Sequence, residues 1–154
     1  MRPDSEMPIP TGVALTAIRR PFHLPGTLLT ERAYAKPKTL DYFDEPDSEN
    51  FVVHIAGFLT AFMNLRLVRT YPHGGGHVDA VYLDLDTSER LRVEWELYST
   101  NFVAHGHDPA VCDMVFCWQD NLSGSDRNRL LAANPDLSVV EFRKLLHHYD
   151  FKRT

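Results

Sequence analysis

Alternating apolar and polar positions dominate the middle of the chain and predict two neighbouring strands. Over residues 90–98, Leu, Val, Trp and Leu alternate with Arg, Glu, Glu and Tyr, a period of two that is typical of a strand. Residues 111–118 form a strongly apolar run, interrupted by Asp113, and predict a second strand. The first strand places Glu94 and Glu96 on one face, about 7 Å apart at a rise of ~3.3 Å per residue.

Upstream, the pattern becomes that of a helix followed by two strands. Apolar residues recur at helical spacing after an Asp-Ser pair that can cap a helix over residues 49–64. Residues 65–71 alternate as a strand, and residues 78–86 follow as another strand with Asp79 near its start. Between them, the glycine run 74–76 lacks the Gly-Lys-Thr/Ser sequel of a phosphate-binding loop, so we interpret it as a flexible connection.

Beyond residue 118 the chain predicts two helices. Ser125 or Asp126 can cap a short helix, which an Asn-Pro-Asp sequence ends. Ser138 and Glu141 have the spacing of a capping box and predict the start of a last helix with an apolar stripe.

Length and composition predict one globular domain. The 154 residues are enough for a hydrophobic core, and 44% hydrophobic with 24% charged residues is typical of folded chains. We expect a locally basic, irregular arm over 1–42, a core over 43–122, and C-terminal helices over 123–154 packed on the same domain. The net charge of -5 argues against a generally basic surface but allows a local basic patch. No apolar run approaches ~18 residues and no signal-peptide pattern is present, so we expect a cytoplasmic protein without membrane insertion.

Cys112 and Cys117 are the only cysteines, so the sequence predicts no disulfide scaffold. If both lie on one strand, their spacing of five places them on opposite faces. We interpret them as buried, reduced thiols. A structural Zn²⁺ site that combines them with His105 and His107 is therefore not favoured, although His and Cys are the preferred zinc ligands.

Acidic and histidine residues gather around the two central strands. Asp79 opens the preceding strand, Glu94 and Glu96 share a face, and His105 and His107 follow in a loop that contains glycine. Acids from two adjacent strands can converge on a hard divalent cation, because such cations take oxygen ligands. The alternative is that the two glutamates form a solvated outer face.

These residues resemble a known family. The order helix, strand, Asp79, hairpin, Glu94-Trp95-Glu96, helix or loop, apolar strand resembles the core of the PD-(D/E)xK nuclease superfamily, which has the restriction-endonuclease-like fold. Residues 93–118 are also similar to a branch in which a Glu-x-Glu strand is followed by Ser-x-Asn-Phe, His-Gly-His-Asp-Pro and Cys-Asp before an apolar strand. The resemblance implies an α/β fold with a central mixed β-sheet of about four strands flanked by helices, in the order αβββαβ.

The same resemblance implies a divalent-metal-dependent nuclease that hydrolyses phosphodiester bonds, with Mg²⁺ or Mn²⁺ as cofactor. Asp79 and Glu94 match the two metal-binding acids of the motif. Glu96 stands where the motif usually has lysine, and would act as a ligand or a base. Because no lysine falls within the predicted core, activation of water would come from the metal and from Glu96, His105 or His107.

The implied partner is nucleic acid, with DNA favoured, and a homodimer is an open alternative because many nucleases of this fold act as dimers. We expect Ser99, Asn101 and Asp113 to support the site, and Asp113 to hold one of the two histidines, since an unpaired buried carboxylate is costly. Basic residues near both ends would hold the nucleic-acid backbone: Arg19, Arg20, Lys36, Lys38, Lys152 and Arg153.

Two other functions remain open at this point. The chain can have the nuclease fold without the activity, and bind nucleic acid or a partner protein in a defence or repair system. It can also be a zinc-stabilised interaction domain. The metal content of the purified protein separates the zinc-stabilised domain from the other two functions.

Overall fold

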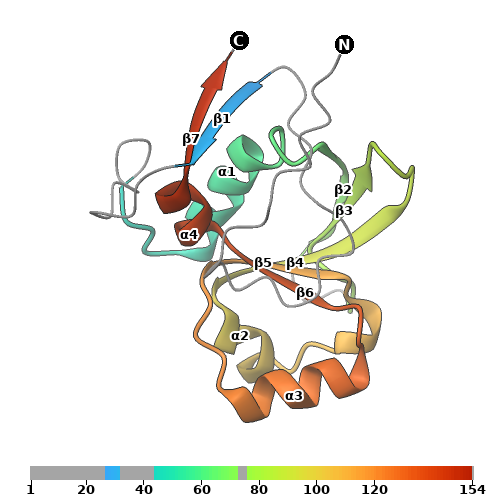
Figure 1. Ribbon diagram of the computed structural model, residues 1–154. Helices are drawn as coiled ribbons and strands as arrows, with labels where there is room; N and C mark the ends of the chain where they lie inside the picture. Colours follow the sequence, from blue (N-terminus) through green and yellow to red (C-terminus); the bar gives the residue numbers. More distant parts are fainter. Residues whose placement is uncertain (1–26, 32–43, 73–75, 154) are drawn as a thin grey trace.

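A mixed five-stranded sheet lies between two helical layers in the computed structural model, which describes residues 27–31, 44–72 and 76–153 (Figure 1). β2 pairs antiparallel with β3, as β3 does with β4, whereas β5 lies parallel to both β4 and β6. The predicted mixed α/β sheet is therefore confirmed, with one strand more than the expected four. In spatial order the strands are β2 (Leu65–Thr70), β3 (Ala80–Asp84), β4 (Arg90–Tyr98), β5 (Met114–Gln119) and β6 (Ser138–Glu141).

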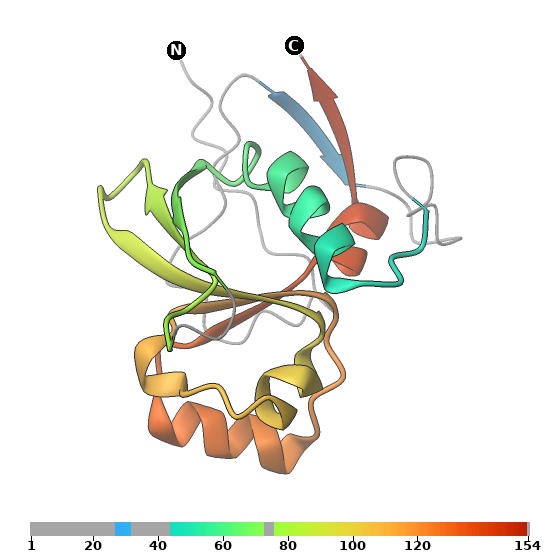
Figure 2. The ribbon, with the colours of Figure 1, turned by 180° about the vertical axis from the view of Figure 1, so that it is seen from behind.

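The helices divide between the two faces of the sheet, as Figure 2 also shows from behind. α1 (Glu49–Leu59) and α4 (Phe142–His148) cover one face, and their apolar side chains form the larger core cluster with β3, β4 and β5. α2 (Ser99–Ala104) and α3 (Gly124–Ala133) lie on the other face, over a smaller cluster with β5 and β6. In the described ranges, no helix combines the length and apolar character needed to cross a bilayer.

A second sheet joins two segments far apart in the sequence. β1 (Thr27–Glu31) pairs antiparallel with β7 (Tyr149–Arg153). The arm expected to be irregular over residues 1–42 thus contains a strand, and the last helix ends at His148 instead of continuing toward the C-terminus.

The first helix begins as predicted and ends earlier than predicted. Ser48 is its N-cap, and every third or fourth residue from Val52 is buried, as expected for a helix with one core face. The helix was expected to continue to Asn64, but it ends at Leu59, followed by a turn in which Asn64 has a φ of 55°. Asn tolerates this left-handed conformation, which redirects the chain into β2.

The prediction that Ser138 and Glu141 begin the last helix is wrong. Residues 138–141 form β6, all four of them buried, and the helix starts at Phe142. The spacing fits a capping box, but Val139 and Val140 are β-branched and favour a strand. The open edge of β5 supplies backbone partners for that strand, so tertiary pairing overrides the local signal.

Asp113 joins the start of β5 to β4. Its carboxylate accepts hydrogen bonds from the backbone N–H of Arg92 at 2.8 Å and from two guanidinium nitrogens of Arg92 at 2.9 and 3.0 Å. We expected Asp113 to hold a histidine; the structure shows this forked contact with Arg92 instead. Arg92 lies two residues before Glu94 on the same strand face, and this position alone does not predict its contact with Asp113.

We predict that Asp113→Ala lowers the free energy of unfolding by about 2 kcal/mol, because a backbone N–H and a guanidinium lose a nearly buried charged acceptor. Asp126→Ala is the matched control: Asp126 contacts the 66% exposed Arg129 on α3, and such surface pairs contribute about 0.5 kcal/mol. Urea denaturation of both variants measures the difference. Equal, small effects would show that the Arg92 contact does not fasten β4 to β5.

Candidate functional site

The centre of β4 carries two buried carboxylates on one face. Glu94 is 3% exposed and Glu96 1% exposed, so the alternative of a solvated outer face is wrong. Between them, Trp95 points to the opposite face and packs in the core with α1 and α4. Asp79 immediately precedes β3 and stands opposite Glu94, and its carboxylate accepts the backbone N–H of Trp95 at 2.8 Å. The three predicted acids therefore come together on one face of the sheet.

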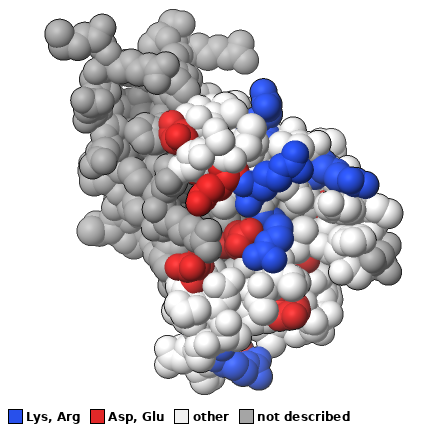
Figure 3. All heavy atoms as spheres, turned by 90° about the vertical axis from the view of Figure 1, so that its right-hand side faces the viewer, with Lys and Arg blue, Asp and Glu red and all other residues white. Residues whose placement is uncertain are grey.

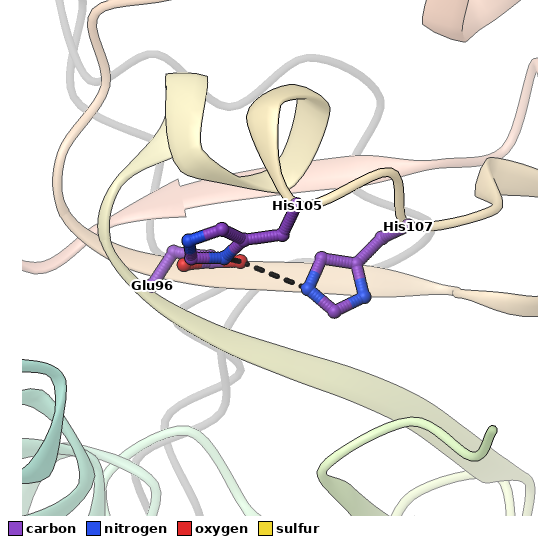
Figure 4. Close-up of side chains that lie close together, drawn as sticks. All are labelled: Glu96, His105 and His107. Carbon is purple, nitrogen blue, oxygen red and sulfur yellow. Dashed lines mark hydrogen bonds and ion pairs between the residues drawn. The ribbon is translucent and has the colours of Figure 1, made fainter. Parts of the chain in front are cut away.

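Two histidines lie over this acidic pair, and Figure 4 shows both of them beside Glu96. His107 contacts both glutamates: Nδ1 is 3.2 Å from Glu94 Oε1, and Nε2 is 3.1 Å from Glu96 Oε1. His105 Nδ1 lies 3.2 Å from the same oxygen of Glu96. The imidazole of His107 thus bridges the two carboxylates. The resemblance to the nuclease superfamily did not imply this bridge.

The end of α2 explains how both histidines reach the same strand. The helix finishes at Ala104, with His105 as its C-cap, and Gly106 adopts a φ of 71°. That left-handed conformation suits glycine at a helix end and turns the chain back toward β4. The ring of His107 stacks on Phe102 of α2, with centroids 5.3 Å apart, which fixes the orientation of the imidazole.

Burial and charge shift the protonation of this group. Burial raises the pKa of Glu94, with a further rise from Asp79 and an opposing effect from His107. Hydrogen bonds to Glu94 and then Glu96 raise the pKa of His107 to about 10. At neutral pH His107 is therefore an imidazolium, and supplies the positive charge that lies between the two carboxylates.

The carboxylates retain capacity for another ligand. Oε2 of Glu94 and Oε2 of Glu96 are buried and have no hydrogen-bond partner. One ligand atom each from Glu96, His105 and His107 lies within 4.8 Å of the others. A carboxylate with two imidazoles is a known donor set for divalent transition metals, so these residues fit such an ion once the imidazoles are neutral.

Two of the predicted supporting residues are engaged elsewhere. Ser99 Oγ donates to Asp120 at 2.6 Å and accepts the backbone N–H of Asn121 at 2.9 Å, which ties the start of α2 to the loop after β5. The backbone carbonyl of Asn101 accepts the N–H of His105 at 2.8 Å. Ser99 thus anchors the helix, and Asn101 acts through the backbone of the turn that carries the histidines.

The cysteines are buried and free, as predicted. Burial raises the pKa of both thiols. The expectation that they face opposite sides assumed one strand, but Cys112 precedes β5 and packs with Cys117 in the smaller core cluster. Within the described chain, the candidate metal group consists of Glu96, His105 and His107, without either thiol.

Two of the six predicted basic residues belong to a described element. Lys152 and Arg153 lie on β7, and the four from the N-terminal arm fall outside the described residues: Arg19, Arg20, Lys36 and Lys38. Lys144, on α4, lies 3.5 Å from Glu141 of β6. In the sheet, Cys117 of β5 lies between Glu141 of β6 and Glu96 of β4. The amine of Lys144 therefore contacts a carboxylate that is not part of the candidate site.

No protein-family model, curated protein or solved structure matches the chain. The chemistry of the site is therefore inferred from its side chains. They offer buried oxygen ligands and imidazoles that can hold or release protons, and the side chain of His105 is 52% exposed.

We predict that, in EDTA, the free energy of unfolding falls as pH rises through the interval between 6.5, the ordinary pKa of histidine, and about 10, the value for folded His107. The folded state binds this proton more tightly than the unfolded state, so its stabilising effect is complete below 6.5 and is lost at high pH. His107→Ala removes this contribution. The difference in the free energy of unfolding between the parent and the His107→Ala variant therefore becomes smaller toward high pH.

The measurement is urea denaturation of parent and variant at about pH 7 and about pH 9. His54→Ala, at an exposed position on α1, is the control and keeps the parent pH dependence. A difference between parent and His107→Ala that stays constant with pH would contradict an imidazolium bridge.

Proposed function

We propose that this protein is a divalent-metal-dependent nuclease that hydrolyses phosphodiester bonds of nucleic acid. One observation carries the proposal: Glu94 and Glu96 are buried side by side next to Asp79, and each keeps one carboxylate oxygen without a partner. Buried charges of one sign need a cation. A metal site satisfies that need, and nuclease chemistry uses such a site.

The element order gives further support. α1, β2, β3, β4, α2 and β5 follow one another in the order αβββαβ, which is the order that the resemblance to the PD-(D/E)xK superfamily implies. Asp79 lies beside the first residue of β3 and Glu94 lies on β4, and acids on two neighbouring strands support the proposal.

The residues proposed to hold the metal are Asp79, Glu94 and Glu96, with His105 and His107 adjoining Glu96. The proposed cofactor is Mg²⁺ or Mn²⁺; the carboxylates suit both, and the two imidazoles shift the preference toward Mn²⁺. When bound, such an ion lowers the pKa of an attacking water and offsets charge on the phosphate.

The protein's own groups have separate roles in this proposal. Glu96 orients the water and takes up its proton, with His107 in direct contact with this carboxylate, because no lysine adjoins the group among the described residues. His105, at the exposed side, exchanges that proton with solvent. Phe102 holds the ring of His107 in place by stacking.

A second function is favoured by the bridge itself. The imidazolium of His107 already offsets the charge of Glu94 and Glu96, so the acids are balanced without a metal. The fold would then serve as a catalytically inactive module that binds nucleic acid or a partner protein.

Metal binding separates these two functions. We predict that Mn²⁺ raises the thermal midpoint relative to EDTA, and does so more than Mg²⁺, because a ligand that binds only the folded state stabilises it. Glu96→Gln removes a charged ligand and abolishes the shift. Glu141→Gln, a control at a buried carboxyl of β6 outside the cluster, retains the shift. No shift with any of these ions would favour the inactive module.

Cleavage is the direct test. We predict that purified protein cuts labelled DNA or RNA, single-stranded or duplex, with Mn²⁺ or Mg²⁺ and not with EDTA. Glu94→Gln, which keeps the shape of the side chain and removes its charge, lowers the rate by about 100-fold or more. Glu89→Gln, exposed in the hairpin turn, leaves the rate unchanged. Cutting that survives in Glu94→Gln would place the activity elsewhere.

A further inference from the structure

Arginines occupy the half of the sheet that α2 and α3 leave uncovered. The register aligns Arg66 of β2, Leu83 of β3 and Arg90 of β4 in one row. It aligns Arg69, Val81 and Arg92 in the next row. Directly paired residues of antiparallel strands project to the same face, so each row presents two guanidinium groups on either side of an aliphatic side chain.

The acidic site forms the next row along the same face. The ladder extends to Tyr71, whose N–H donates to the carbonyl of Asp79 at 2.8 Å, and Asp79 stands opposite Glu94. On β4, Arg90 and Arg92 precede Glu94 by four and two residues. At ~3.3 Å per residue, the outer arginine row lies about 13 Å from the acids. The arginines and the acids thus lie on the same face of the sheet.

Three of the four arginines are available for a ligand. Arg66, Arg69 and Arg90 are exposed, and no ion pair joins them to a carboxylate within the described residues. Arg92 differs, because Asp113 engages it. Figure 3, which views the side of the molecule where the β3–β4 hairpin lies, shows Lys and Arg side chains gathered together with acidic side chains next to them.

The acids of the hairpin turn are engaged locally. Asp84 accepts the N–H groups of Asp86 and Thr87 at 2.8 and 3.2 Å, and Asp86 accepts the side-chain amide of Asn64 at 2.7 Å. These contacts hold the turn, and among the described residues Arg66, Arg69 and Arg90 have no carboxylate partner. Like charges on neighbouring strands repel one another, so the surface favours a ligand with repeated negative charges.

We propose that Arg66, Arg69 and Arg90 form the surface on which the sugar-phosphate backbone of nucleic acid lies on its way to the acidic site. This inference rests on the proposed function, and names the substrate contacts of that same site. Guanidinium groups bind phosphate oxygens through paired hydrogen bonds. Such contacts position a nucleic acid without reading its sequence.

An aromatic pair stands where this surface meets the acids. The rings of Tyr71 and His77 stack with centroids 4.7 Å apart, and the guanidinium carbon of Arg69 lies 4.7 Å from the centre of the Tyr71 ring. Stacked aromatic side chains receive unpaired bases. The surface therefore binds single-stranded nucleic acid more tightly than duplex.

The test is fluorescence anisotropy with fluorescein-labelled single-stranded DNA, single-stranded RNA and duplex DNA of mixed sequence, in EDTA so that nothing is cut. Each substitution among Arg66→Ala, Arg69→Ala and Arg90→Ala weakens binding about 3- to 10-fold. Each also reduces the slope of log affinity against log salt by about 0.7 for single strands. The triple variant loses about 100-fold or more. Arg129→Ala, an exposed arginine on α3, leaves affinity and slope unchanged.

Circular dichroism and the thermal midpoint verify that each variant is folded. Parent protein that binds none of the three nucleic acids at low salt overturns the inference, as does a triple variant that binds like the parent. If the three arginines bind poly-glutamate but not nucleic acid, the inference is also overturned. The surface would then be assigned to an acidic protein partner.

The outcome is separable from that of the cleavage assay. Binding that depends on the arginines, without cleavage, supports the surface and rejects the metal-dependent nuclease. Cleavage by a triple variant at the parent rate and affinity rejects the surface and leaves the nuclease intact.

Discussion

Two carboxylates buried side by side at the centre of the sheet impose the strongest constraint on this structure. Glu94 and Glu96 lie on β4, the middle strand, and are only 3% and 1% exposed. A buried pair of like charges is stable only with protonation or a nearby cation. The turn after α2 meets that need by placing the imidazole of His107 between the two oxygens.

Several local features of the fold follow from that arrangement. α2 is short, and Gly106 turns the chain so that the histidines face β4. Phe102 stacks on His107, and Ser99 fastens the helix to the loop after β5. On the other face, α1 and α4 bury the apolar half of β4. One strand therefore separates a conventional apolar core from a charged centre that is open at the side of His105.

The sequence predicted the elements whose signals are local. Alternation predicted β4 to the residue, and the αβββαβ order was apparent from hydrophobic periodicity and resemblance together. β6 was missed because its strand forms by pairing with β5, while Ser138 and Glu141 mimic a helix start. The contact between Asp113 and Arg92 depends on which strands become neighbours, as do the arginine rows, and spacing along one strand does not specify either.

The site was predicted only in part for the same reason, because some of its contacts depend on which elements become neighbours in the fold. Alternation along one strand placed Glu94 and Glu96 on the same face. The register of the β3–β4 hairpin places Asp79 opposite Glu94. The bridging role of His107 depends on the angle at which one helix ends, which residue types alone do not determine. Arg66 and Arg69 are three residues apart, a spacing that places two side chains on opposite faces of a regular strand. Only the register shift between Leu67 and Arg69 against β3 brings both arginines to the face of the acids.

The most direct test of a metal centre at Glu94, Glu96 and the two histidines is anomalous diffraction from crystals soaked with Mn²⁺. A metal centre here predicts an anomalous peak beside these carboxylates. His107 would then no longer bridge both of them, because the metal ion replaces the imidazolium as their counter-charge. A crystal soaked at saturating Mn²⁺ that shows no anomalous peak at the site, and in which His107 still contacts both Glu94 and Glu96, would contradict a metal-dependent function for this site.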